Sequence, residues 1–237
     1  MTGNIANDRR IVTAGFWRRH AVWPLIVSLA IFALFSATDL DRQFALDWAW
    51  DATAGHFIAR DSFLANTIVH RGGRIVIWIA GLTCLIGWGL NARRGDRDLR
   101  RAFGFSFCAL ALAILVAGGL KQITNVDCPW DLQGFGGPRP YVHLFADRPN
   151  DLPRAQCYPA AHSASGFALF ALYFGFLNTH RKFARLALAL ALVTGTLFGL
   201  AQQARGAHFL SHDLSSALLA WFVCLGLYWR VQWPIKS

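Results

Sequence analysis

Six apolar runs divide this sequence, and they constrain its fold more than any other feature. A helix needs about 20 predominantly apolar residues to cross a bilayer, and flanking Trp and Arg side chains can extend shorter runs into the interfacial regions. We therefore expect membrane helices rather than buried helices of a soluble protein. The runs cover approximately residues 21–37, 75–90, 102–120, 162–177, 183–200 and 214–229.

The composition favours the same interpretation. Of the 237 residues, 55% are hydrophobic and only 15% are charged, whereas soluble domains usually carry about 25% charged residues. The sequence predicts an all-α fold, an integral membrane bundle of six transmembrane helices formed by a single domain over residues 1–237. We expect the first run to be retained as a helix, because no small-residue cleavage site clearly follows it.

The distribution of Lys and Arg indicates the orientation of this bundle. Basic residues gather in the N-terminal segment, in the short loops after the second and fourth runs, and at the C-terminus. The positive-inside rule then predicts that both termini are cytoplasmic. The residues are Arg9, Arg10, Arg18, Arg19, Arg93, Arg94, Arg97, Arg100, Arg101, Arg181, Lys182, Arg185, Arg230 and Lys236.

The opposite, outer face receives the loops 38–74 and 121–161 and the turn at 205–213. In a bacterial cell this arrangement predicts an inner-membrane protein whose outer face meets the periplasm. The formal net charge of +10 is spread over the ends of apolar runs, which suits membrane lipids with anionic headgroups. We expect no nucleic-acid partner, because no motif of that class is present.

Three polar clusters interrupt the apolar pattern, and the predicted orientation brings all of them to the outer face. They are residues 121–140, 159–162 and 205–213. The clusters supply cations in Lys121, Arg139 and Arg205, which suit the non-bridging oxygens of a phosphate. The sequence therefore predicts a phosphate-handling site.

The same clusters supply groups for acid, base or nucleophilic work. His162 and Ser163 stand at the start of a predicted helix, where free backbone N–H groups favour an anion. His208 and His212 are one helical turn apart and can face one site, with Asp213 available to orient a histidine. The His208/His212 spacing also resembles a metal-binding pair, so a metal-dependent membrane oxidase or hydroxylase is an alternative.

The remaining histidines lack such polar neighbours in the sequence. We expect them to be ordinary structural or surface residues. They are His20, His56, His70, His143 and His180.

Two of the five cysteines, Cys128 and Cys157, fall in the same outer loop. An outer compartment permits disulfides, so we predict a Cys128–Cys157 bridge that holds the loop over the site; two free thiols are the alternative. Cys84, Cys108 and Cys224 lie inside apolar runs and are expected to be packing residues.

The ordered set of polar residues resembles the type 2 phosphatidic acid phosphatase superfamily, whose three motifs are K-x6-R-P, P-S-G-H and S-R-x5-H-x3-D. The resemblance extends from about Lys121 to the C-terminus. Cys128-Pro129 replaces the first Arg-Pro, and the second motif reads Pro159-Ala160-Ala161-His162.

The third motif departs further from the family pattern. Aligning it on His208 puts Gln202 at the arginine position and His212 at the aspartate position, so Arg205 and Asp213 are displaced. Aligning it on His212 leaves Ser216 at the aspartate position and no arginine, so the alignment on His208 is preferred.

The resemblance implies a role for each matched residue. His208 is expected to be the nucleophile that forms a phosphohistidine, and His162 the acid that protonates the leaving oxygen. Lys121 would clamp the phosphate, with Arg139 and Arg205 as displaced substitutes for the family arginines. Asp213 or His212 would orient His208, and no metal or other cofactor is expected.

The leading hypothesis is a membrane phosphatase acting on a phosphorylated lipid: a phospholipid, a polyprenyl diphosphate or lipid A. A phosphotransferase that moves phosphate between lipids would use the same residues. A non-catalytic protein that binds or transports lipid phosphates is a further alternative.

Overall fold

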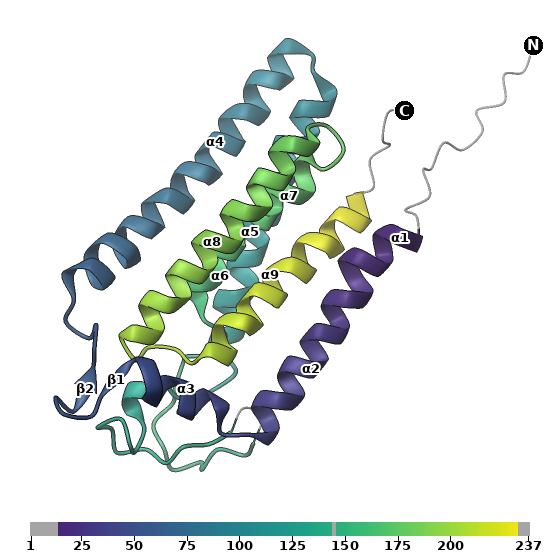
Figure 1. Ribbon diagram of the computed structural model, residues 1–237. Coiled ribbons are helices and arrows are strands. Elements are labelled where there is room, and N and C mark those ends of the chain that lie inside the picture. Colours follow the sequence, from purple (N-terminus) through teal and green to yellow (C-terminus); the bar gives the residue numbers. More distant parts are fainter. Residues whose placement is uncertain (1–13, 144–145, 232–237) are drawn as a thin grey trace, which may run out of the picture.

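The computed structural model describes residues 14–143 and 146–231 and is mostly helical (Figure 1). Arg9, Arg10 and Lys236, which contribute to the predicted orientation, lie outside the described residues. The elements in chain order are α1 (Ala14–Trp17), η1 (Arg18–Val22), α2 (Trp23–Ala37), α3 (Leu40–Trp48), β1 (Trp50–Asp51), β2 (His56–Phe57), η2 (Leu64–Gly72), α4 (Gly73–Arg94), α5 (Arg97–Lys121), η3 (Pro129–Asp131), α6 (Ala161–Phe167), α7 (Phe170–Phe176), α8 (Arg181–Ala204) and α9 (Leu210–Val231).

Five helices of the described chain are long and apolar enough to cross a membrane. Large apolar side chains cover their outward surfaces, including Trp78 (78% exposed) and Leu115 (70% exposed), and such exposure suits contact with acyl chains. These features indicate a membrane protein. The helices are Ala14–Ala37, Leu64–Arg94, Arg97–Lys121, Arg181–Ala204 and Leu210–Val231.

The fourth apolar run folds differently from the others. It forms two short helices, α6 and α7, with a turn at Ala168 and Leu169 where backbone hydrogen bonds shift to a shorter spacing, as from Leu169 to the Gly166 carbonyl. Both short helices pack against α5, α8 and α9. The count of six transmembrane helices therefore stays a prediction.

The second span begins earlier in the structure than the apolar run does in the sequence. Residues 64–72 form η2, a π-helix that continues directly into α4. The apolar run in the sequence begins only at Ile75, because His70, Arg71 and Arg74 lower the hydropathy before it. The predicted outer loop 38–74 is thus helical in its last part.

Local sequence signals explain the tight connection between α4 and α5. Gly95 adopts a left-handed conformation with φ of 76° and ends α4, as glycine commonly does after a helix. Asp96 then caps α5, its carboxylate accepting hydrogen bonds from the backbone N–H groups of Asp98 and Leu99. An N-cap of this kind contributes about 1 kcal/mol.

Small residues allow the central helices to approach closely. A Cβ added at Gly166 of α6 would lie 2.7 Å from the Cα of Gly195 in α8, so these two backbones are in direct contact. Alanines of α5, α7 and α8 fill the surrounding core. This packing holds the end of α6 against α8.

A cap of short elements covers one end of the bundle (Figure 1). It comprises α3, the antiparallel β1–β2 pair with Trp50 opposite Phe57, and the described parts of the connection between α5 and α6. Phe57 and Phe135 are its buried centre, joined by Phe209 from the α8–α9 turn. The carboxylate of Asp41 accepts a hydrogen bond from the Ser211 N–H at 2.9 Å and ties α3 to α9. The start of α1, the end of α9 and the α4–α5 turn lie at the opposite end.

Candidate functional site

The polar residues singled out in the sequence gather beneath the cap, at one end of the bundle. Lys121 is the last residue of α5, and His162 lies in the first turn of α6. Arg205 and His208 lie in the turn between α8 and α9. Most of these side chains are buried or half-buried, so the site is a polar cluster inside an otherwise apolar protein.

Gly206 makes the α8–α9 turn possible. Its φ of +78° lies in the left-handed region, which favours glycine. A Cβ at this position would also lie 2.3 Å from the ring of Phe57, and the Gly206 carbonyl accepts a hydrogen bond from the Trp130 N–H at 3.0 Å. The turn therefore packs directly against the cap. In this position the His208 side chain points inward and is only 5% exposed.

His208 is held by a backbone carbonyl. Its Nδ1 lies 2.9 Å from the carbonyl oxygen of Cys157. A carbonyl can only accept, so Nδ1 carries the proton and the neutral ring keeps its lone pair on Nε2. Burial, followed by the nearby His212 and the charge of Lys121, lowers the pKa of His208 well below its usual value. The ring is consequently neutral, with a nucleophilic Nε2, at neutral pH.

The carbonyl that orients His208 belongs to a cross-linked segment. The structure joins Cys157 to Cys128 in a disulfide, and the Cys157 N–H donates to the Val126 carbonyl at 3.0 Å. The segment before α6 is therefore tied to the segment that follows α5. Sequence reasoning missed this role of Cys157, because a backbone carbonyl leaves no mark in a side-chain pattern.

His162 lies between aromatic rings. Its imidazole stacks on Phe198 of α8 with ring centroids 4.4 Å apart, and the ring of His70 is 4.5 Å away. The Nε2 atom of His162 is buried and has no hydrogen-bond partner within the described residues. This nitrogen is therefore available to a group that enters the site.

Arg205 and Lys121 bring positive charge to the histidines. Arg205 donates from Nη1 to the side-chain oxygen of Gln202 at 2.9 Å, while its buried Nε has no partner in the part of the chain that the structure describes. Burial lowers the pKa of Arg205. Lys121 lies close enough to act electrostatically on His208 and His70. Two half-buried cations beside buried histidines suit an anionic ligand.

Asp213 and Ser163 lie next to each other rather than beside the Nδ1 of His208. The Asp213 carboxylate accepts a hydrogen bond from Gln203 Nε2 at 2.6 Å and another from the Ser163 hydroxyl. It rests against Gly199, where a Cβ would lie 2.8 Å from the carboxyl carbon. Both side chains are buried, and they join the start of α6 to α8 and α9.

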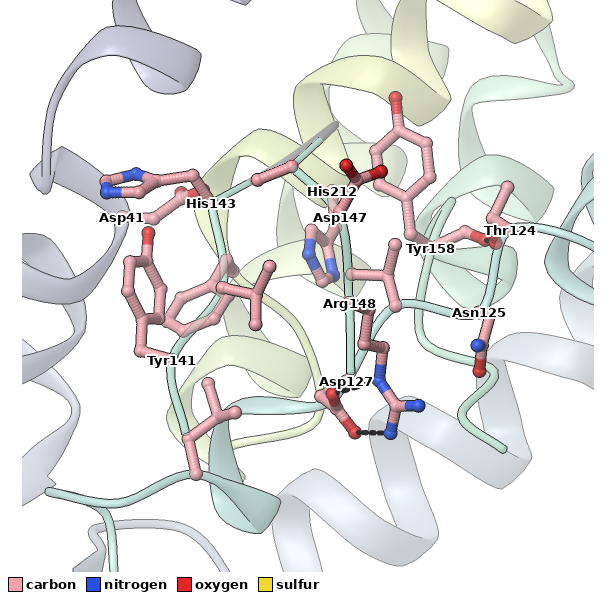
Figure 2. Close-up of a pocket in the computed structure, with 15 residues that line it drawn as sticks. Asp41, Thr124, Asn125, Asp127, Tyr141, His143, Asp147, Arg148, Tyr158 and His212 are labelled. Atoms are coloured by element: carbon pink, nitrogen blue, oxygen red, sulfur yellow. Dashed lines mark hydrogen bonds and ion pairs between the residues drawn. The ribbon is translucent and has the colours of Figure 1, made fainter. Parts of the chain in front are cut away.

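Arg139 is engaged in the cap. Its Nη1 lies 2.5 Å from Asp127, which also accepts from Arg148 Nε at 2.6 Å (Figure 2). Burial opposes ionisation of Asp127, but the hydrogen bonds from Arg148 and Arg139 outweigh it and keep the pKa of this carboxyl below its usual value. These contacts hold Arg139 in the cap, and its contact with a phosphate stays a prediction.

His212 borders a cavity of about 320 Å³ within the cap. Figure 2 shows its ring facing the cavity from α9, opposite Tyr141 and the Asp127–Arg148 pair. His212 is 2% exposed, and its ring centroid is 5.9 Å from that of His208. The two histidines therefore lie side by side, with His212 toward this cavity.

His70 also belongs to the site, although the sequence suggested an ordinary residue. Its ring contacts His162, and its Nδ1 lies 2.9 Å from Gln202 Nε2. One signal in the sequence could have indicated this role of His70: an apolar stretch is interrupted by His70, Arg71 and Arg74. In a membrane helix, ionisable residues usually face a functional interior.

No group of three or more His, Cys, Asp or Glu side chains is placed to hold a metal ion within residues 14–143 and 146–231. The His208/His212 pair, considered as a metal site, therefore lacks a further protein ligand of these types in the described chain.

Comparison with known families finds a match. A family model described as the PAP2 superfamily matches residues 103–236. This range includes Lys121, His162, Arg205 and His208. No curated protein and no solved structure matches the chain.

Proposed function

Because this chain belongs to the PAP2 superfamily, whose members are generally phosphatases acting on phosphate esters, we propose that it hydrolyses a lipid phosphate monoester or diphosphate through a phosphohistidine at His208. The observation that carries this proposal is the hydrogen bond between His208 Nδ1 and the Cys157 carbonyl. It leaves Nε2 as the nitrogen with the lone pair, as an in-line attack on phosphorus requires.

In the first step, His208 Nε2 attacks phosphorus and the bond from phosphorus to the leaving oxygen breaks. His162 donates a proton to this oxygen as the bond breaks. A monoester therefore releases a lipid alcohol, and a diphosphate releases a lipid monophosphate, each with the new proton on the leaving oxygen. An anion bound beside His162 favours the protonated imidazole. Lys121 and Arg205 hold the non-bridging oxygens and stabilise the charge that spreads over them.

In the second step, water attacks the phosphorus of the phosphohistidine. The N–P bond breaks, His162 accepts a proton from the water, and inorganic phosphate leaves. His208 returns to its neutral form with the proton on Nδ1. No step in this scheme requires a metal ion.

A lipid substrate is supported by the position of the site at the end of five long apolar helices. We propose that this end faces the outer side of the inner membrane of a bacterial cell, as the basic loops predict. The headgroup would then enter beneath the cap while the acyl or prenyl chains stay in the bilayer. A transfer of phosphate to a second lipid would use the same residues, with a lipid hydroxyl replacing water.

The test is phosphate release by the detergent-solubilised protein in EDTA. The panel contains phosphatidic acid, phosphatidylglycerophosphate, polyprenyl diphosphate and lipid A. We expect release from at least one of them in the presence of the chelator. Loss of all activity in EDTA, restored by a divalent cation, would contradict the metal-independent scheme.

The disulfide should matter for the rate, because it anchors the carbonyl that orients His208. Replacing both Cys128 and Cys157 by Ser should lower kcat roughly 10-fold or more, since small displacements of a catalytic group are costly. The bridge should also contribute on the order of 3 kcal/mol to stability. The measurement is turnover at a temperature where circular dichroism shows the variant folded.

The matched control is Cys108→Ser, which changes a free and exposed cysteine. Equal rates for this control and the double variant would show that the disulfide does not contribute to catalysis.

A further inference from the structure

The segment η2 lies outside residues 103–236 that match the family, yet it contacts the residue proposed as the acid. Two consecutive residues of η2 reach His162. The Val69 carbonyl accepts a hydrogen bond from the His162 ring, and the His70 ring lies beside it. A π-helix is wider than an α-helix and often occurs at functional sites. The contact of Val69 and His70 with His162 therefore comes from the π-helical part of the second span.

The orientation of the Gln202 amide follows from its partners. Arg205 Nη1 lies 2.9 Å from the Gln202 side-chain oxygen, and a guanidinium can only donate hydrogen bonds. The amide nitrogen of Gln202 must then face His70, and it lies 2.9 Å from His70 Nδ1. Since this nitrogen donates, His70 Nδ1 accepts, and the neutral His70 ring carries its proton on Nε2.

Arg205, Gln202 and His70 thus form a chain of directed hydrogen bonds that ends at the ring beside His162. The Gln202 donor that faces Nδ1 disfavours the doubly protonated form of His70, because that form has no lone pair to offer Gln202. Four cations lie around the two rings. They are Arg71 and Arg74 on η2 and α4, Lys121 at the end of α5, and Arg205 after α8.

We infer that His70 is a positioning residue for His162: Gln202 and Arg205 hold it as the neutral Nε2–H tautomer, and its ring fixes His162 where the leaving oxygen is protonated. This inference rests on the proposed function for its kinetic consequence. The tautomer of His70 and the effect of its ring on His162 can be tested whether or not the protein is active.

The first experiment reads the tautomer directly. Histidine labelled with ¹⁵N is incorporated into the full chain in detergent, and the His70 signals are assigned by their loss in His70→Phe. At neutral pH we expect an unprotonated Nδ1 and a protonated Nε2. In Gln202→Glu, whose carboxylate can only accept, the proton should move to Nδ1 or the ring should become cationic. A protonated Nδ1 in the unmodified protein would overturn the inference, whether or not the protein is active.

The second experiment measures the rate and the titration of His162. His70→Phe keeps an aromatic ring in place but removes both nitrogens. We expect kcat to fall roughly 10- to 100-fold while KM changes little, with a displaced titration of the His162 signals. His70→Gln, which keeps polar atoms that can accept from Gln202, should recover part of the rate.

The matched control is His180→Phe, an exposed histidine before α8 that should leave kcat and the His162 titration unchanged. If His70→Phe behaves like this control, His70 only fills space and the inference is wrong. If the unmodified protein shows the expected tautomer but releases phosphate from no substrate, the proposed function fails and the placement of His70 survives.

Discussion

His208→Gln should abolish turnover, with kcat lower by at least about 1,000-fold. The glutamine keeps a polar side chain of similar size, but it has no nitrogen lone pair with which to attack phosphorus. The measurement is phosphate release from the best lipid substrate, by protein whose folding is checked by circular dichroism and size-exclusion chromatography.

His212→Gln is the informative comparison for this variant, because His212 lies next to His208 and faces the neighbouring cavity. We expect its loss of rate to be much smaller. The assignment of the nucleophile would be wrong if His212→Gln were inactive and His208→Gln retained more than a few per cent of the rate.

Removing the acid should give a loss that depends on the leaving group. We expect His162→Asn to lower kcat/KM about 100-fold or more for a lipid phosphate, whose alkoxide leaving group needs a proton. An aryl phosphate analogue leaves as a weakly basic phenolate, so the same variant should lose less than about 10-fold with it. The measurement is kcat/KM over a series of leaving groups of different basicity.

The unmodified protein should show a shallow dependence on leaving-group basicity, and His162→Asn a steep one. Ser165→Ala serves as the control, because its hydroxyl donates to the His162 backbone carbonyl at 2.6 Å and not to the imidazole. Parallel slopes for His162→Asn and the unmodified protein would show that His162 is not the proton donor.

Hydropathy predicted the long helices well because lipid exposure imposes a simple requirement: nearly every outward residue must be apolar. The same reasoning failed at residues 64–74. His70 and Arg74 interrupt the apolar pattern, so the sequence suggested a loop, whereas the structure continues the helix through them. Helices that line a polar interior carry such interruptions, and a hydropathy average cannot distinguish them from loops.

The candidate site was partly predictable for a different reason. Lys121, His162, Arg205 and His208 stand at the ends of apolar segments, so any bundle with this order of helices brings them together. The partners of each side chain were not predictable. The Cys157 carbonyl holds His208, and Asp127 engages Arg139. These contacts depend on how residues 122–143 and 146–160 fold over the bundle, and no periodicity in the sequence predicts the path of these residues.

The most direct test of the central claim is to trap the phosphorylated enzyme. The protein is mixed with a ³²P-labelled lipid phosphate in EDTA, quenched under alkaline denaturing conditions that preserve phosphohistidine, and digested for peptide mapping. The account predicts label on the peptide that contains His208, lost on mild acid treatment and absent in His208→Gln. Label on the His162 peptide, or turnover by the unmodified protein without any acid-labile label under these conditions, would contradict it.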